Sequence, residues 1–174
     1  MNETRLYILC GLPFAGKTTL AQELVNRFGF MYIDVDQINT SFGVGLHGAP
    51  ISPEEWVRTY DEAYKQLADA LNSRRSVLFE GASYTKELRD RLRTIAFERG
   101  IASKVIYLDI SKSEARQRLH SNRITPRRHN VRDDNFALVV TYFEPPAQEE
   151  QVIYCRQSEP LDKWILQNFR RTNH

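Results

Sequence analysis

The feature that most constrains this chain is a glycine-rich segment, residues 11–18, with the sequence GLPFAGKT. It follows a short apolar run, LYILC at residues 6–10, and precedes residues 18–28, where apolar side chains recur at spacings of three and four. The first pattern is typical of a buried parallel strand, and the second of an amphipathic helix that ends before Gly29. The chain must therefore place a tight glycine turn between the end of a strand and the start of a helix.

The same alternation of strand and helix patterns continues along the chain. Predicted strands cover residues 6–10, 31–33, 76–80, 104–108 and 151–155, and predicted helices cover residues 18–28, 53–73, 85–99, 112–123, 131–143 and 161–169. We expect the second strand to stay extended through residues 34–36. The alternation predicts an α/β fold with a five-stranded parallel sheet flanked by helices. No repeat or linker divides the sequence, so a single domain over residues 1–174 is expected.

Composition narrows the class of protein further. With 174 residues, of which 41% are hydrophobic and 26% charged, the chain lies in the ordinary globular range, which excludes a disordered or collagen-like protein. Cys10 and Cys155 lie far apart and form no zinc motif. No apolar run approaches the roughly 20 residues of a membrane span, and the first residues do not form a secretion signal. We expect a cytoplasmic protein that does not bind membranes.

Residues 11–18 match the pattern G-x-x-x-x-G-K-[ST] without a mismatch. The glycines let backbone N–H groups turn toward a phosphate, Lys17 would contact the β- and γ-phosphates, and the Thr18 hydroxyl would ligate Mg²⁺. The residues predicted to bind the nucleotide here are Gly11, Leu12, Pro13, Phe14, Ala15, Gly16, Lys17, Thr18 and Thr19. Because the chain lacks the N-K-x-D segment typical of guanine-specific proteins, we expect ATP. The alternative interpretation is a glycine turn with an incidental lysine.

Three acidic residues come at the ends of predicted strands. Asp34 and Asp36 follow the second strand, and side chains two apart in an extended segment point to one side. We expect Asp34 to hold Mg²⁺ and Asp36 to accept the proton of an attacking hydroxyl, with helix capping as the alternative for either residue. Glu80 ends the third strand and is a further candidate for Mg²⁺; a salt bridge to Lys17 or an arginine is the alternative.

Basic residues are concentrated in residues 112–132, which contain seven lysines and arginines and one acidic residue, Glu114. We interpret this region as a lid that closes over ATP, with Arg118 and Arg123 as the catalytic candidates. Arg127 and Arg128 could instead reach an anionic acceptor. The alternatives are a solvated face or a nucleic-acid patch.

Residues 37–75, between the second and third strands, are expected to build the acceptor side as an insertion. The candidate pocket residues there are Phe42, Trp56, Arg58, Tyr60 and Tyr64. Tyr60 and Tyr64 share a helix face, a stripe that is more often core than pocket. We interpret His47 as a loop residue and assign no metal to His120 or His129.

The chain resembles the nucleoside- and nucleotide-kinase-like branch of P-loop proteins, and more narrowly the small ATP-binding kinases related to bacteriophage polynucleotide kinase, zeta toxins and chloramphenicol phosphotransferase. The resemblance covers nearly the whole chain. It rests on residues 11–18, 32–36 (YIDVD), 77–81 (VLFEG), 118–123 and 143–146 (FEPP). It implies that Asp36 activates the acceptor hydroxyl, that Arg118 or Arg123 belongs to the lid, and that Pro146 lies near the adenine. The Asp-x-Asp arrangement is also similar to that of gluconate and shikimate kinases.

These features predict an ATP-dependent kinase that moves the γ-phosphoryl group of Mg-ATP to a hydroxyl of a small molecule. An arginine closely follows the matching aspartate in polynucleotide kinases and none follows Asp36, so a nucleic-acid acceptor is possible but not favoured. The alternatives are a toxin-like kinase of nucleotide sugars, a non-catalytic ATP-binding regulator, and an RNA-binding P-loop protein that uses the basic segment.

Overall fold

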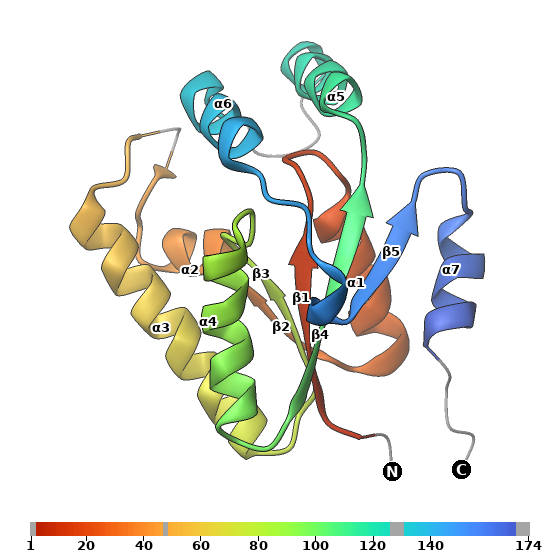
Figure 1. Cartoon of the computed structure of the whole chain (residues 1–174). Helices are drawn as coiled ribbons and strands as arrows, with labels where there is room; N and C mark the ends of the chain where they lie inside the picture. The colour runs from red at the N-terminus through yellow and green to blue at the C-terminus, as the bar shows by residue number, and fades with distance from the viewer. Residues whose placement is uncertain (1–2, 47–48, 126–130, 170–174) are drawn as a thin grey trace.

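A parallel sheet of five strands forms the centre of the computed structural model, which describes residues 3–46, 49–125 and 131–169 (Figure 1). The strands are β1 (Arg5–Cys10), β2 (Met31–Asp34), β3 (Val77–Glu80), β4 (Ala102–Asp109) and β5 (Val152–Arg156). They lie in the order β2-β3-β1-β4-β5, and every neighbouring pair is parallel. This arrangement confirms the α/β fold predicted from the sequence.

Helices cover both faces of the sheet because successive side chains of a strand point to opposite faces. From β1, Leu6 and Ile8 pack with helices α3 (Pro53–Asn72) and α4 (Lys86–Phe97). Leu9 packs on the other face, with α1 (Lys17–Phe28) and α7 (Leu161–Asn168). Strands buried on both faces need the nearly continuous apolar runs that the sequence shows.

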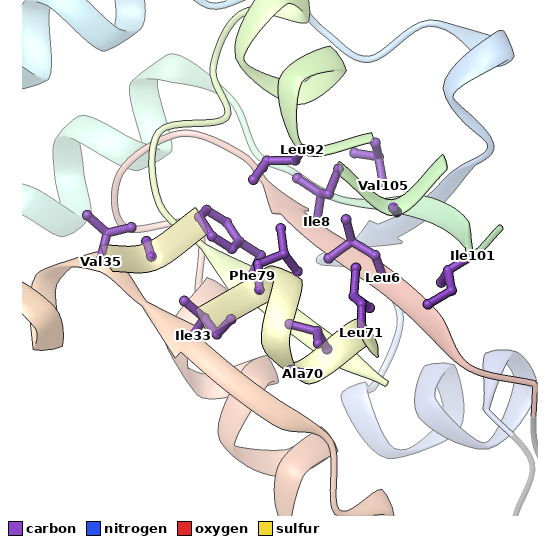
Figure 2. Packing of buried hydrophobic residues seen from close by; sticks show 14 of the residues in the cluster. Leu6, Ile8, Ile33, Val35, Ala70, Leu71, Phe79, Leu92, Ile101 and Val105 are labelled. Atoms are coloured by element: carbon purple, nitrogen blue, oxygen red, sulfur yellow. The ribbon is translucent and has the colours of Figure 1, made fainter. Parts of the chain in front are cut away.

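Buried apolar side chains pack α3 and α4 against one face of the sheet. Figure 2 shows Leu6 and Ile8 of β1 beside Phe79 of β3, with Leu92 of α4 above them and Leu71 of α3 below them. These side chains are at most 1% exposed. Burying each one stabilises the fold by roughly 1.5–3 kcal/mol before the cost of ordering it, so the strand ends are held on a rigid base.

Two further helices lie beyond the carboxyl ends of the strands, α5 (Lys112–Ile124) and α6 (Asp133–Tyr142) (Figure 1). Ser111 begins α5 as its N-cap, and its hydroxyl accepts the Glu114 N–H at 3.1 Å. A cap of this kind satisfies one of the four N–H groups that a helix start leaves unpaired. The two helices lie on the side of the sheet where β1 ends and the glycine-rich segment begins.

A buried ion pair fixes the segment that returns from α6 to β5. Arg89 of α4 meets Glu150, at the end of the short 3-10 helix η2 (Gln148–Glu150), through Nε–Oε2 and Nη2–Oε1 distances of 2.6 and 3.0 Å. Both side chains are fully buried. Arg89 also donates to the carbonyl oxygens of Ser83 and Glu144, at 2.9 and 3.0 Å. One guanidinium thus joins α4, the loop after β3 and the segment after α6.

The structure corrects one element boundary of functional interest. The sequence predicts an extended segment through residues 34–36, but β2 ends at Asp34 and a helix, α2 (Val35–Ser41), begins at once. Asp34 is the N-cap of α2, and its Oδ1 accepts the Asp36 N–H at 2.9 Å. Asp34 therefore caps α2, whereas Asp36 lies in the first turn of the helix.

Candidate functional site

The glycine-rich loop occupies the turn between β1 and α1, as the sequence predicts. Gly11 has φ of +153°, and a Cβ atom there would lie 2.8 Å from the Leu108 carbonyl oxygen of β4. Gly16 has φ of +98° and is the N-cap of α1 without a side-chain cap. Phe14 also has a positive φ, of 68°, with its ring buried in the core. Glycine adopts such angles readily, whereas Phe14 does so rarely, so the packing of its ring in the core helps to hold the loop in this shape.

Two cations contact this loop. The Lys17 ammonium donates to the Gly11 and Leu12 carbonyl oxygens, each at 3.0 Å. Arg118 of α5 donates to the Phe14 carbonyl oxygen at 3.0 Å and to Glu114 at 2.9 Å. A helix start without a side-chain cap, together with two adjacent cations, is an arrangement suited to an anion such as phosphate.

Carboxylates lie opposite this positive end, on neighbouring strands. The register of β2 and β3 pairs Asp34 with Glu80. The Thr18 hydroxyl donates to Glu80 Oε1 at 3.1 Å, so the first turn of α1 is joined to the end of β3. The Tyr32 hydroxyl lies 2.5 Å from Glu80 Oε2 and 3.3 Å from Asp34 Oδ2, and it bridges the two acids.

Burial and mutual repulsion change the acidity of this cluster. Burial, and after it the negative charges of Glu80 and Asp36, together raise the pKa of Asp34 to about 6. Burial and the adjacent Glu80 also raise the pKa of Tyr32, so this phenol stays protonated as a hydrogen-bond donor. Repulsion among closely spaced acids is the condition that a bound cation relieves.

The chemistry of Thr18, Asp34 and Glu80 fits Mg²⁺, because hydroxyl and carboxylate oxygens are the ligands that this ion prefers. The hydrogen bond from Thr18 to Glu80 brings two of these candidates together, and Tyr32 joins the third. Within the described ranges, no group of three or more His, Cys, Asp or Glu residues has the spacing of a direct metal cluster.

Two cavities adjoin the loop. The first, of about 720 Å³, is called the polar cavity, and its lining includes Gly16, Thr18, Thr19, Gln22, Arg118 and Asn122. The second, of about 420 Å³, is called the aromatic cavity, and its lining includes Lys17, Trp56, Tyr60, Glu80, Tyr84 and Leu138. Asp34 and Asp36 are the residues that line both. A group bound in one cavity can thus meet a group bound in the other beside these two carboxylates.

Helix α3 forms one wall of the aromatic cavity. Trp56 and Tyr60 lie one turn apart, with ring centroids separated by 5.9 Å, and the Ala82 N–H donates to the Tyr60 hydroxyl at 2.8 Å. Tyr64, one turn further, stacks on Phe79 in the core at 6.4 Å. The aromatic stripe of α3 is thus divided: Tyr64 belongs to the core, and Tyr60 both packs on the core and lines the cavity.

Several predicted residues lie away from the two cavities. The Arg123 guanidinium pairs with Asp133 and ties α5 to α6. Pro146 is buried in the segment held by Arg89 and lines neither cavity. Among the described bases of residues 112–132, Arg118 is the one that lines a cavity. His47, Arg127, Arg128 and His129 fall outside the described residues.

Sequence reasoning missed Tyr32 and the contribution of α6. Tyr32 lies two positions before Asp34, so the period of a strand places both side chains on one side, and this spacing was the available signal. Asn135, Leu138 and Val139 of α6 line the aromatic cavity. No local pattern marks these residues, because their role depends on how the fold brings α6 to the same cavity as α3.

Comparisons with known proteins agree with this arrangement. The family described as an AAA domain matches residues 6–146. A candidate kinase from Chloroflexus aurantiacus superposes with a TM-score of 0.74 at 18% identity, over 97% of this chain and 100% of that one. A gluconokinase from Sinorhizobium meliloti gives 0.63 at 17% identity, over 94% and 87%. Chaetomium thermophilum Kti12, solved with ADP-AlF3, gives 0.68 at 18% identity, over 92% and 94%. No curated protein matches the sequence significantly.

Proposed function

The chain belongs to the AAA domain family and has the fold of P-loop kinases, and from this premise we propose that it is an ATP-dependent phosphotransferase. It would move the γ-phosphoryl group of Mg-ATP to a hydroxyl of a small molecule. The observation that supports this proposal best is the pair of cavities that share Asp34 and Asp36. A binding protein needs one cavity, whereas a transferase needs two that meet at the reacting atoms.

The polar cavity is the proposed ATP side. Backbone N–H groups at the start of α1 would hold the β-phosphate, and Lys17 would exchange its contacts with loop carbonyls for contacts with phosphate oxygens. Arg118 already lies against the loop at Phe14 and would stabilise charge on the transferred group. Residues 112–132, which carry Arg118, would act as the lid.

Thr18, Asp34 and Glu80 would hold Mg²⁺ and its waters. When bound, this ion neutralises charge on the β- and γ-phosphates. The Tyr32 hydroxyl donates its one proton to Glu80 and also lies 3.3 Å from Asp34 Oδ2, so it would help to position both carboxylates. The protein's own contribution is thus to keep these oxygens in place before the substrate arrives.

Asp36 is the proposed general base. Asp34 is half-buried and uses its oxygens for the α2 cap and for Tyr32, whereas Asp36 is exposed and lines both cavities. The Asp36 carboxylate would accept the proton of the acceptor hydroxyl while the new O–P bond forms. The bond from the γ-phosphorus to the bridging oxygen would break, and ADP would leave with that electron pair.

We also propose the cytoplasmic location that the sequence predicts. Among the helices that the structure describes, none combines the length and apolar character needed to cross a bilayer.

The RNA-binding alternative has less support. Arg123 and Arg132 pair with Asp133 and Asp134 at the start of α6, so part of the basic segment is already neutralised. A protein that makes several phosphate contacts would lose RNA affinity steeply as salt increases. A salt titration with single-stranded RNA distinguishes this alternative from a kinase.

The proposal is tested by acceptor-dependent release of ADP from Mg-ATP. Asp36→Asn should lower the rate by roughly 10²–10⁴-fold while ATP affinity changes little, because the lost group acts on the acceptor proton. Asp69→Asn, an exposed change on α3 far from the cavities, is the matched control. If Asp36→Asn releases ADP at the wild-type rate, the general-base role is wrong; if the wild type binds ATP but never releases ADP with any hydroxyl compound, the regulator alternative gains.

A further inference from the structure

The residues that line the aromatic cavity indicate which kind of acceptor it would bind. Away from the loop and its carboxylates, the lining is made largely of rings and aliphatic chains. The residues that form it include Val35, Trp56, Tyr60, Tyr84, Leu138 and Val139. Asn135 of α6 supplies a neutral polar group. A surface of this kind binds a flat apolar framework by contact and by exclusion of water, and it offers few hydrogen bonds to a polyol.

Charge in the cavity is predominantly negative. Asp34, Asp36 and Glu80 line it, whereas Lys17 is its single basic residue among those described. The Lys17 ammonium is engaged by the Gly11 and Leu12 carbonyl oxygens and faces the phosphate loop. Among the described residues that line this cavity, Lys17 alone would offer a cation to a carboxylate or phosphate on the acceptor.

Three described arginines of α3, α4 and α5 contact other groups. The Arg58 guanidinium carbon lies 4.0 Å from the centroid of the Phe42 ring, and that of Arg91 lies 4.7 Å from the centroid of the Tyr64 ring. Arg118 contacts the loop from the polar cavity. None of these three arginines lines the aromatic cavity.

We propose that the aromatic cavity selects an uncharged alcohol whose hydroxyl is carried on an aromatic or similarly apolar framework. This inference rests on the proposed phosphotransferase function and names the class of its acceptor. The ring would lie between Trp56 and Tyr60 of α3 and Leu138 and Val139 of α6, with the hydroxyl directed toward Asp36. The volume of about 420 Å³ suits a compact molecule of this kind.

The test uses two matched pairs of probes. 1,4-Benzenedimethanol and 4-(hydroxymethyl)benzoate share a ring and differ in charge, and sorbitol and gluconate form the same pair without an apolar face. Dissociation constants are measured from Trp56 fluorescence with Mg-ADP present, so that the polar cavity is filled. The only other tryptophan, Trp164, is 1% exposed beneath α7 and supplies a constant background.

The benzenedimethanol should bind roughly tenfold or more tightly than the benzoate, and more tightly than sorbitol or gluconate, because a charge buried without a partner is costly. Leu138→Lys places a cation at the cavity wall and should reduce or reverse the preference for the neutral ring compound. Leu166→Lys makes the same change on α7, at a residue that is 70% exposed, and should leave the preference as in the wild type.

The outcomes separate this inference from the proposed function. Equal or tighter binding of the benzoate by the wild type would overturn the inference, as would binding of benzenedimethanol no tighter than that of sorbitol. The same probes are then assayed for ADP release. Selective binding without transfer to any probe keeps the cavity assignment and contradicts the kinase, whereas faster transfer to gluconate than to benzenedimethanol keeps the kinase and contradicts the assignment.

Discussion

Asp34 has two tasks that oppose one another, since it caps α2 and also lies beside two other acids. Its cap hydrogen bond favours the ionised form, whereas burial and the charges of Glu80 and Asp36 favour the protonated form and raise the pKa to about 6. Because its pKa is raised, the ionised Asp34 side chain is less favourable in the folded protein than in water, and the stability of the rest of the fold keeps it there. Such tension is common where a protein prepares a site for a cation.

The tension at Asp34 predicts a pH-dependent stability. An unfolded Asp34 would release its proton near 3.8, so between about pH 4 and 6 the folded state binds more protons and stability falls as pH rises. Asn also caps helices, so Asp34→Asn removes the charge and keeps the cap. Without divalent cations the variant should be more stable than wild type by about 1 kcal/mol at pH 7, after allowance for solvent screening, and equally stable near pH 4.

Urea unfolding at both pH values measures this difference. Asp69→Asn, at an exposed position, should show no such dependence. A stability difference between Asp34→Asn and wild type that stays the same at both pH values would contradict the account of the acid cluster.

Gly11 gives a second prediction at the scale of one residue. In Gly11→Ala, the new methyl group meets the Leu108 carbonyl oxygen at 2.8 Å, and the residue must adopt a φ of +153°. We expect a loss of stability of about 2 kcal/mol and weaker Mg-ATP binding, measured by urea unfolding and by calorimetry. Gly29→Ala is the control, because Gly29 also has a positive φ but open space around it; it should cost about 1 kcal/mol and leave ATP binding intact. Equal effects of both changes on ATP binding would argue against a role for the loop's close packing.

At the scale of elements, the site depends on α6 and on the segment that follows it. α6 closes one side of the aromatic cavity, and its return toward β5 is fixed by Arg89, Glu150 and the hydrogen bond from the Glu144 N–H to the Tyr84 carbonyl at 2.8 Å. Tyr84 lines the same cavity. The buried ion pair therefore links the segment after α6 to the loop that carries Tyr84, at the aromatic cavity.

Glu150→Gln tests this connection. The change keeps the shape of the side chain but leaves the buried Arg89 without a charged partner, which should cost about 3–5 kcal/mol in urea unfolding. Glu149→Gln, at the exposed neighbouring position, should change stability by less than about 0.5 kcal/mol. Similar losses in both variants would show that the pair does not carry the stability assigned to it.

At the scale of the whole molecule, local patterns predicted the fold well. The glycine loop, the capped helices and the apolar strands each follow from neighbouring residues, and their order implies a parallel sheet. The boundary at residues 34–36 was wrong because a strand that runs directly into a capped helix has the same residue types as a longer strand. Tyr32 and the α6 wall were missed because their partners, Glu80 and α3, are distant in the sequence and meet only through the sheet register and the return of the chain.

The candidate functional groups of the molecule also lie at one edge of the sheet. Parallel strands end at one edge of the sheet, and that edge carries the loop, the carboxylates and the two cavities, with α5 and α6 beyond it (Figure 1). The near balance of 24 basic and 22 acidic residues therefore hides a separation of charge, with Lys17 and Arg118 in contact with the loop and Asp34, Asp36 and Glu80 opposite them. This separation is what a phosphoryl transfer between two cavities requires.

The central claim is that a phosphoryl group passes from one cavity to the other beside Asp36. Phosphorus NMR of Mg-ATP incubated with 1,4-benzenedimethanol and a panel of other alcohols tests it directly, because ADP and a new phosphate monoester must appear together. The account predicts both signals with the wild type and their loss with Asp36→Asn, which should still bind ATP. ATP that remains intact with every alcohol while bound to the wild type, or a monoester formed equally fast by Asp36→Asn, would contradict it.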